Sequence, residues 1–156
     1  MKIMFVCTGN TCRSAMADGL AKKVVKERKL DIEIYSAGIF AAKGEHASYN
    51  SVAIMKEYDV DIVTHTATPI EESNVEEMDL VLCATQKHKM QVISKYPELT
   101  GRVYTIKEYA GYDKEDTNID IQDPWGYDLN MYRTCAAEIS YCVDKIVEKC
   151  IENMKK

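Results

Sequence analysis

The chain has 156 residues, of which 46% are hydrophobic, and this suits one compact α/β domain over residues 1–156. The formal net charge of -5 offers no basic stripe, so we expect no nucleic-acid partner. No secretion signal and no apolar run of membrane length stand out, which predicts a cytoplasmic protein without a membrane partner. The six cysteines are therefore expected as reduced thiols and not as a disulfide scaffold.

Strand and helix signals alternate along the first half of the chain. Ser14 is expected to cap the first helix, in which apolar residues recur at helical spacing. The predicted elements are a buried strand over residues 2–6, a helix over 14–28, a strand over 32–36, a helix over 47–58 and a short helical turn over 70–75.

The second half continues the alternation. It predicts strands over 79–83 and 102–106, a helix over 86–95, a short turn over 107–110 and a final helix from the cap Asp128 to about residue 154. The segment 111–126 is rich in Asp, Asn, Gly and Pro, and such long loops usually carry function. Cys135, Cys142 and Cys150 lie seven and eight residues apart on the last helix, so that successive ones are roughly 10 Å apart, and they are expected to be core residues and not a metal site.

Strands separated by helices favour parallel pairing with right-handed crossovers. The predicted fold is a three-layer α/β sandwich with a four-stranded parallel sheet. Ligands of such sheets bind beyond the carboxyl ends of the strands. Cys7, which follows the first strand directly, is expected at that edge.

The most specific pattern is Cys-x5-Arg, in which Cys7 and Arg13 enclose five residues between a strand and a helix. Gly9 and Asn10 tolerate the left-handed backbone of a tight loop, so successive N–H groups can converge on one oxyanion. The helix that follows adds its positive end. The pattern predicts a phosphate-binding loop with a thiol at its floor.

The residue types of this loop favour one kind of chemistry. Amide dipoles, a helix N-terminus and a guanidinium favour the thiolate form of Cys7, which makes it a candidate nucleophile. Arg13 presents a planar set of donors that can bind two phosphoryl oxygens while its charge is kept. A thiolate that binds an oxyanion is therefore expected here.

Transfer of a phosphoryl group to Cys7 requires a proton donor for the leaving group, and the long loop supplies Asp123. Pro124 fixes the backbone after this acid and so holds its direction. The other acids of the loop lack such a proline; they are Asp113, Glu115, Asp116 and Asp120.

The run from Cys7 to Ser14 (CTGNTCRS), with Asp123-Pro124 far along the chain, resembles the low-molecular-weight protein tyrosine phosphatases over the full length. The resemblance implies a metal-independent hydrolysis of phosphorylated proteins through a cysteinyl-phosphate, without a cofactor and with inorganic phosphate as product. It implies that Cys7 is the nucleophile, Arg13 the phosphate-binding arginine and Asp123 the general acid. The implied phosphate-binding residues are Thr8, Gly9, Asn10, Thr11, Cys12, Arg13 and Ser14.

Further roles follow from the same resemblance. Asn10 and Ser14 resemble the polar pair that holds the loop and stabilises the thiolate, and His65 resembles a buried histidine bonded to that pair. Cys12 resembles a second loop cysteine that can form a reversible disulfide with Cys7 on oxidation, although it can equally be a well-packed loop residue. Ala15 stands where the family commonly has Pro, which bears on the helix start more than on the chemistry.

Thr11 bears on the substrate. Many family members carry Ile or Leu there, whereas Thr resembles a bacterial branch of protein-arginine phosphatases. Its hydroxyl suits the guanidinium of phosphoarginine better than an apolar side chain would, so phosphoarginine is slightly favoured over phosphotyrosine. Phe40, Trp125 and Tyr127 are expected to form the pocket rim, where aromatic faces can hold either leaving group.

Two alternatives remain open at this point. The loop and fold also resemble a thioredoxin-coupled arsenate reductase, but that chemistry needs two relay cysteines past the third strand, where only Cys83 is found. A non-catalytic phosphate-binding module is the second alternative. Such a module would have no use for a thiol floor or for Asp123.

Overall fold

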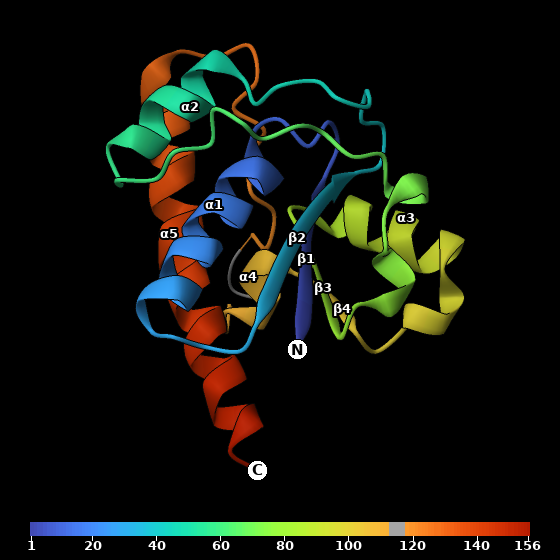
Figure 1. Cartoon of the computed structure of the whole chain (residues 1–156). Helices are drawn as coiled ribbons and strands as arrows, with labels where there is room; N and C mark the ends of the chain where they lie inside the picture. Colours follow the sequence, from blue (N-terminus) through green and yellow to red (C-terminus); the bar gives the residue numbers. More distant parts are fainter. Residues whose placement is uncertain (113–117) are drawn as a thin grey trace.

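The computed structural model describes residues 1–112 and 118–156, and its centre is a four-stranded sheet (Figure 1). All pairings are parallel, in the order β2-β1-β3-β4. The strands are β1 (Lys2–Cys7), β2 (Glu33–Gly38), β3 (Leu80–Cys83) and β4 (Val103–Thr105). The predicted α/β architecture is confirmed.

Helices cover both faces of the sheet (Figure 1). One face carries α1 (Arg13–Glu27), α2 (Tyr49–Lys56), α4 (Ile106–Tyr109) and α5 (Leu129–Met154). The other carries α3 (Gln86–Lys95) and the 3-10 turns η1 (Ile70–Glu72), η2 (Val75–Glu77) and η3 (Pro97–Leu99). The expected turns at 70–75 and 107–110 are thus two 3-10 turns and the short helix α4.

The alternation of side chains along the central strands explains the two cores. Ile3 and Phe5 of β1 pack toward α1 and α5, whereas Met4 and Val6 pack toward α3. In the last helix, the three cysteines that we expected in the core are buried against the first of these layers. All six cysteines of the chain are free thiols.

The first helix begins differently from the prediction. It starts at Arg13, and Cys12 stands at the cap position without a side-chain cap hydrogen bond. Ser14 is completely buried inside the first turn. Its hydroxyl does not cap the helix because it bonds the Cys7 side chain instead.

The loop between β1 and α1 packs tightly on the end of β2. A Cβ atom added at Gly38 would lie 2.5 Å from the carbonyl oxygen of Thr8, so only glycine allows this approach. Asn10 has a φ of 58° and so adopts the left-handed backbone, as expected. Gly9, for which the same was expected, does not have a positive φ.

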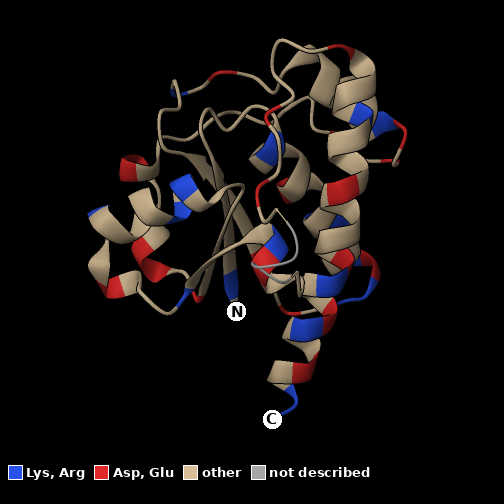
Figure 2. Cartoon of the chain, turned by 180° about the vertical axis from the view of Figure 1, so that it is seen from behind, with Lys and Arg blue, Asp and Glu red and all other residues tan. Residues whose placement is uncertain are grey.

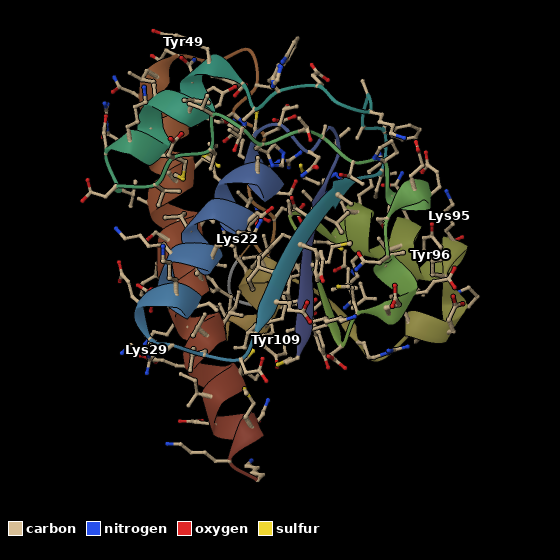
Figure 3. All side chains as sticks on the ribbon, in the orientation of Figure 1. Lys22, Lys29, Tyr49, Lys95, Tyr96 and Tyr109 are labelled. Atoms are coloured by element: carbon tan, nitrogen blue, oxygen red, sulfur yellow. The ribbon has the colours of Figure 1, made fainter. Side chains whose placement is uncertain are left out.

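The ends of the molecule are distinct. Tyr49, at the start of α2, lies at the end where the strands finish, and Lys29, after α1, lies at the opposite end (Figure 3). Basic and acidic residues are interspersed along α5, the long helix that ends near the C-terminus in Figure 2. No helix in the described part of the chain is both long enough and apolar enough to cross a bilayer.

Candidate functional site

The Cys7 thiol lies at the end of β1, where the parallel strands finish, and is only 3% exposed. Its Sγ atom lies 2.9 Å from the Ser14 hydroxyl oxygen. Asn10 Nδ2 donates to the same hydroxyl oxygen at 2.8 Å. The Ser14 hydroxyl oxygen thus accepts a hydrogen bond from Asn10, and its own proton is available for a hydrogen bond to sulfur. That hydrogen bond stabilises a thiolate.

The orientation of Asn10 is itself fixed from a distant segment. Thr68 N–H donates to Asn10 Oδ1 at 3.0 Å, which leaves Nδ2 directed to Ser14. His65 Nε2 donates to the Asn10 carbonyl oxygen at 2.7 Å. His65 is therefore bonded to this network, although it is half-buried and not buried as the resemblance implied.

The loop that surrounds Cys7 is rich in unused donors. Within the described part of the chain, no backbone N–H group of residues 8–12 donates to an acceptor. Arg13 is 5% exposed, and its Nη1 donates to the Ile121 carbonyl at 2.9 Å. Its Nε is buried without a partner among the described residues. Unpaired donors gathered around one thiol suit an anionic ligand.

A buried histidine that the sequence did not single out supports the loop from α3. His88 Nε2 lies 2.8 Å from the Thr8 hydroxyl, and His88 Nδ1 lies 3.0 Å from the hydroxyl of Thr85, the N-cap of α3. Burial, assisted by the Arg13 guanidinium, lowers the pKa of His88 to about 4. The imidazole is neutral near pH 7, so one ring nitrogen donates and the other accepts.

Cys12 is buried on the α5 side of the loop. Its Sγ donates to the Ser48 hydroxyl at 3.3 Å and lies 3.4 Å from the Tyr132 hydroxyl. Burial and the bond with Cys12 raise the pKa of Tyr132 to about 12. Tyr132, another residue that the sequence did not single out, therefore contacts the loop as a neutral phenol.

A pocket of about 230 Å³ opens above Cys7. Two of its residues, Asp123 and Trp125, come from the long loop before α5, and one, Glu45, comes from the segment between β2 and α2. Sequence reasoning missed Glu45. The remaining lining residues belong to the Cys-x5-Arg loop: Cys7, Thr8, Gly9, Thr11, Cys12 and Arg13.

Asp123 is held at the mouth of this pocket. Its Oδ1 accepts from Trp125 N–H at 3.1 Å, and its Oδ2 lies 3.6 Å from Arg13 Nη2. The side chain is still 53% exposed. A carboxylate in this position can exchange protons with solvent and also reach a group bound over Cys7.

The competing acid Asp120 lies elsewhere. It lacks a following proline, but its direction is fixed by another contact, because its Oδ1 accepts from Gln86 N–H at 2.7 Å. It lines an adjoining cavity that shares Arg13 and Asp123 with the pocket above Cys7, but it does not line that pocket itself. Asp113, Glu115 and Asp116 lie outside the described residues.

Two expected rim residues do not line the pocket. Phe40 is 76% exposed, with its N–H bonded to the Thr8 carbonyl oxygen at 2.9 Å. Tyr127 is also exposed, and its N–H bonds the Pro124 carbonyl oxygen. Their backbones are anchored beside the site, while their rings extend into solvent.

Comparison with known proteins adds an independent observation. A family model described as low molecular weight phosphotyrosine protein phosphatase matches residues 2–156. A protein-arginine-phosphatase of Bacillus subtilis is 32% identical over 156 residues, which cover 100% of this chain and 98% of the relative. An arsenate reductase of Staphylococcus saprophyticus is 30% identical and covers 92% of this chain and 93% of its own.

Solved structures agree with this result. A low molecular weight protein tyrosine phosphatase from T. tengcongensis is 41% identical, with a TM-score of 0.88 over 96% of this chain and 99% of that chain. An arginine phosphatase, solved as a cysteine-to-serine mutant with a phosphorylated active site serine, is 32% identical. Its TM-score is 0.87 over 96% of this chain and 95% of that chain.

Proposed function

The chain belongs to the low molecular weight phosphotyrosine protein phosphatase family and is a cysteine-dependent protein phosphatase, and from this premise we propose that Cys7, Arg13 and Asp123 carry out its reaction. The observation that carries the proposal is the contact between Cys7 Sγ and Ser14 Oγ at the floor of a pocket with Asp123 at its mouth. A non-catalytic phosphate-binding module would use neither a thiol at the floor nor a carboxylate at the mouth, and this pocket has both.

The first step forms a cysteinyl-phosphate. The Cys7 thiolate attacks phosphorus, an S–P bond forms, and the bond from phosphorus to the leaving atom breaks with its electron pair. Asp123 donates its proton to that atom. The free N–H groups of residues 8–12 and Arg13 Nε and Nη2 bind the phosphoryl oxygens.

The second step hydrolyses the cysteinyl-phosphate and regenerates the free enzyme. Water attacks phosphorus while Asp123, now a carboxylate, takes its proton. The S–P bond breaks, inorganic phosphate leaves, and the thiolate is stabilised again by Ser14. The proton that Asp123 gives to the leaving atom in the first step is replaced by the proton that it takes from water in the second.

A Cys7→Ser variant tests the nucleophile. Turnover of an aryl phosphate should be lost, because a serine hydroxyl is a much weaker nucleophile than a thiolate, while binding of inorganic phosphate should persist. Steady-state kinetics and phosphate titration measure the two properties. Wild-type-like turnover in the variant would refute the assignment of Cys7.

For the substrate, the proposal is a phosphorylated protein side chain, with phosphoarginine slightly favoured over phosphotyrosine. A protein-arginine-phosphatase and a protein tyrosine phosphatase are both similar to this chain, so the preferred substrate is inferred from the residues that line the pocket. Thr11 lines that pocket and brings a hydroxyl where an aliphatic residue would bring only methyl groups. A Thr11→Ile variant should lower the ratio of phosphoarginine to phosphotyrosine hydrolysis, and an unchanged ratio would contradict the argument.

The arsenate reductase alternative is disfavoured by the thiols. Reduction of arsenate through thioredoxin needs relay thiols that can leave the core and exchange. Cys83 is completely buried, and burial raises its pKa well above that of an exposed thiol. No further cysteine lies among the described residues between Cys83 and α5. A thioredoxin-dependent arsenate assay should therefore show no reduction.

The free state of all six thiols suits a reducing compartment, and we propose the cytoplasm as the place of action. Cys12 is proposed as the partner of Cys7 under oxidation, since both belong to the same pocket lining. Mass spectrometry of the peroxide-treated protein tests this pair.

A further inference from the structure

The pocket has a second carboxylate, Glu45, in addition to Asp123. Of the nine residues that line it, Arg13 alone carries a fixed positive charge. Arg13 is bonded to Ile121 and lies close to Asp123. The wall of the pocket that Glu45 contributes therefore has an acidic group and no cation from the lining residues to neutralise it.

The position of Glu45 is held by backbone pairing. Its carbonyl oxygen accepts from Ala67 N–H at 2.7 Å, and the preceding Gly44 N–H donates to the Ala67 carbonyl at 2.9 Å. His46 and Thr66 continue this pairing as an antiparallel bridge. The residue is thus tied to the segment that also supplies Thr68 and His65 to the loop network.

The side chain of Glu45 is exposed and has no polar partner in the described part of the chain. Within the described residues its carboxylate makes no ion pair or hydrogen bond, in contrast to Asp123, which has both. A free carboxylate beside a site for a phosphoryl dianion repels that dianion. A substrate with a positive charge of its own offsets this repulsion, in addition to the binding of the phosphoryl oxygens by Arg13 and the loop.

We propose that Glu45 is a specificity-determining residue that selects phosphoryl groups with a cationic group next to them. This inference rests on the proposed function. The cation can be the guanidinium of phosphoarginine or a basic side chain that flanks the phosphorylated residue. Both place positive charge within reach of the pocket mouth, and the experiment below distinguishes them.

The size of the effect follows from the exposure of Glu45. An exposed ion pair contributes about 0.2–1 kcal/mol, which corresponds to about 1.5- to 5-fold in kcat/KM. Such an interaction weakens as salt is added, because the screening length falls below 10 Å above about 0.1 M ionic strength. Both the direction and the salt dependence are therefore expected.

The experiment compares three peptides of one length at low and high salt. One carries phosphoarginine with neutral flanks, one phosphotyrosine with neutral flanks, and one phosphotyrosine with lysine flanks. In Glu45→Gln, kcat/KM should fall about 1.5- to 5-fold for the cationic substrates and stay equal or rise for the neutral one. Glu45→Lys should extend the change in the same direction.

The phosphoarginine peptide and the lysine-flanked phosphotyrosine peptide separate the two sources of positive charge, the leaving group and the flanking side chain. A fall for the phosphoarginine peptide assigns the selected cation to the leaving group, and a fall only for the lysine-flanked peptide assigns it to the flank. Glu152→Gln is the matched control, because it removes the same charge from an exposed position near the end of α5. Its ratios should match those of the wild type.

The outcomes also separate this inference from the function on which it rests. If the wild type hydrolyses the peptides but neither Glu45 variant changes their ratios, the role of Glu45 is refuted and the phosphatase proposal stands. If the wild type hydrolyses none of them, both fail. Thermal unfolding midpoints that match the wild type show that the variants are folded.

Discussion

The floor and the mouth of the pocket are built in different ways. On the floor, Cys7, Asn10 and Ser14 are at most 3% exposed and are linked by hydrogen bonds of 2.8–2.9 Å. At the mouth, Trp125 is 71% exposed and the Asp123 side chain 53% exposed. Positions on the floor are fixed by bonds from several segments, whereas those at the mouth depend on two loops.

The difference separates two tasks. Low exposure strengthens the electrostatic interactions of the floor, so changes there should affect every substrate alike. Exposed groups at the mouth interact through water and should mainly alter the choice between substrates. Asp123 is the exception that tests this division, since it lies at the mouth but takes part in proton transfer.

The largest loss of activity from a change at the mouth, and so the strongest exception to the division between floor and mouth, is therefore expected at Asp123. Asp123→Asn keeps the shape and the acceptor for Trp125 N–H but removes the transferable proton, so kcat should fall about 10²- to 10⁴-fold. The loss should be greatest for leaving groups of high pKa. Kinetics on a series of aryl phosphates measures it.

The control for this change is Asp120→Asn, which also neutralises a loop carboxylate. Asp120 bonds Gln86 N–H and does not line the pocket above Cys7, so its variant should keep kcat within a few-fold of the wild type. Equal losses in the two variants would remove Asp123 from the proposed mechanism.

A smaller but uniform effect is expected from the floor. Ser14→Ala removes the donor to Cys7 and leaves Asn10 Nδ2 without its acceptor. A hydrogen bond to a charged group contributes about 1.5–3 kcal/mol, so kcat/KM should fall about 10- to 100-fold. The fall should be the same for phosphoarginine and phosphotyrosine peptides, in contrast to the Glu45 variants.

Ser140→Ala provides the comparison for that variant, because Ser140 is a half-buried serine of α5. It should retain wild-type rates. The rate of Cys7 alkylation by iodoacetamide gives a second readout, and it should be slower near neutral pH in Ser14→Ala. A substrate-dependent loss would instead mean that Ser14 acts on the leaving group.

The sequence predicted the part of the site that is contiguous. Cys7 to Ser14 form one run between a strand and a helix, so their proximity needed no tertiary information. His88 could not be found in this way, because it contacts Thr8 across 80 positions of the chain. Glu45 was missed for the same reason, since only the pairing with Ala67 shows where its segment lies.

Local rules failed where a tertiary contact was stronger. A serine just before a helical stretch is a good cap, but Ser14 is drawn to the Cys7 thiol and lies inside the first turn. Asp120 has no proline to fix it, yet the free N-terminus of α3 supplies a backbone donor. The parallel sheet was easier to predict because buried apolar strands leave few other arrangements.

The smallest expected effect concerns the support of the floor by His88. Its pKa is lowered to about 4 from an ordinary value of 6.5, mainly by burial. As the pH falls below 6.5, the unfolded chain binds a proton at this residue before the folded chain does. Stability is therefore lost across the window from pH 6.5 to about 4.

His88→Asn should flatten this decline by about 1–2 kcal/mol relative to the wild type, because asparagine cannot take up the proton. Chemical denaturation at pH 4.5 and pH 7 measures the difference. The exposed His46 offers the control, and His46→Asn should keep the wild-type slope. If His88→Asn kept that slope too, protonation of a buried imidazole would not contribute to the acid sensitivity, and the His88 contact with Thr8 would be a matter of packing alone.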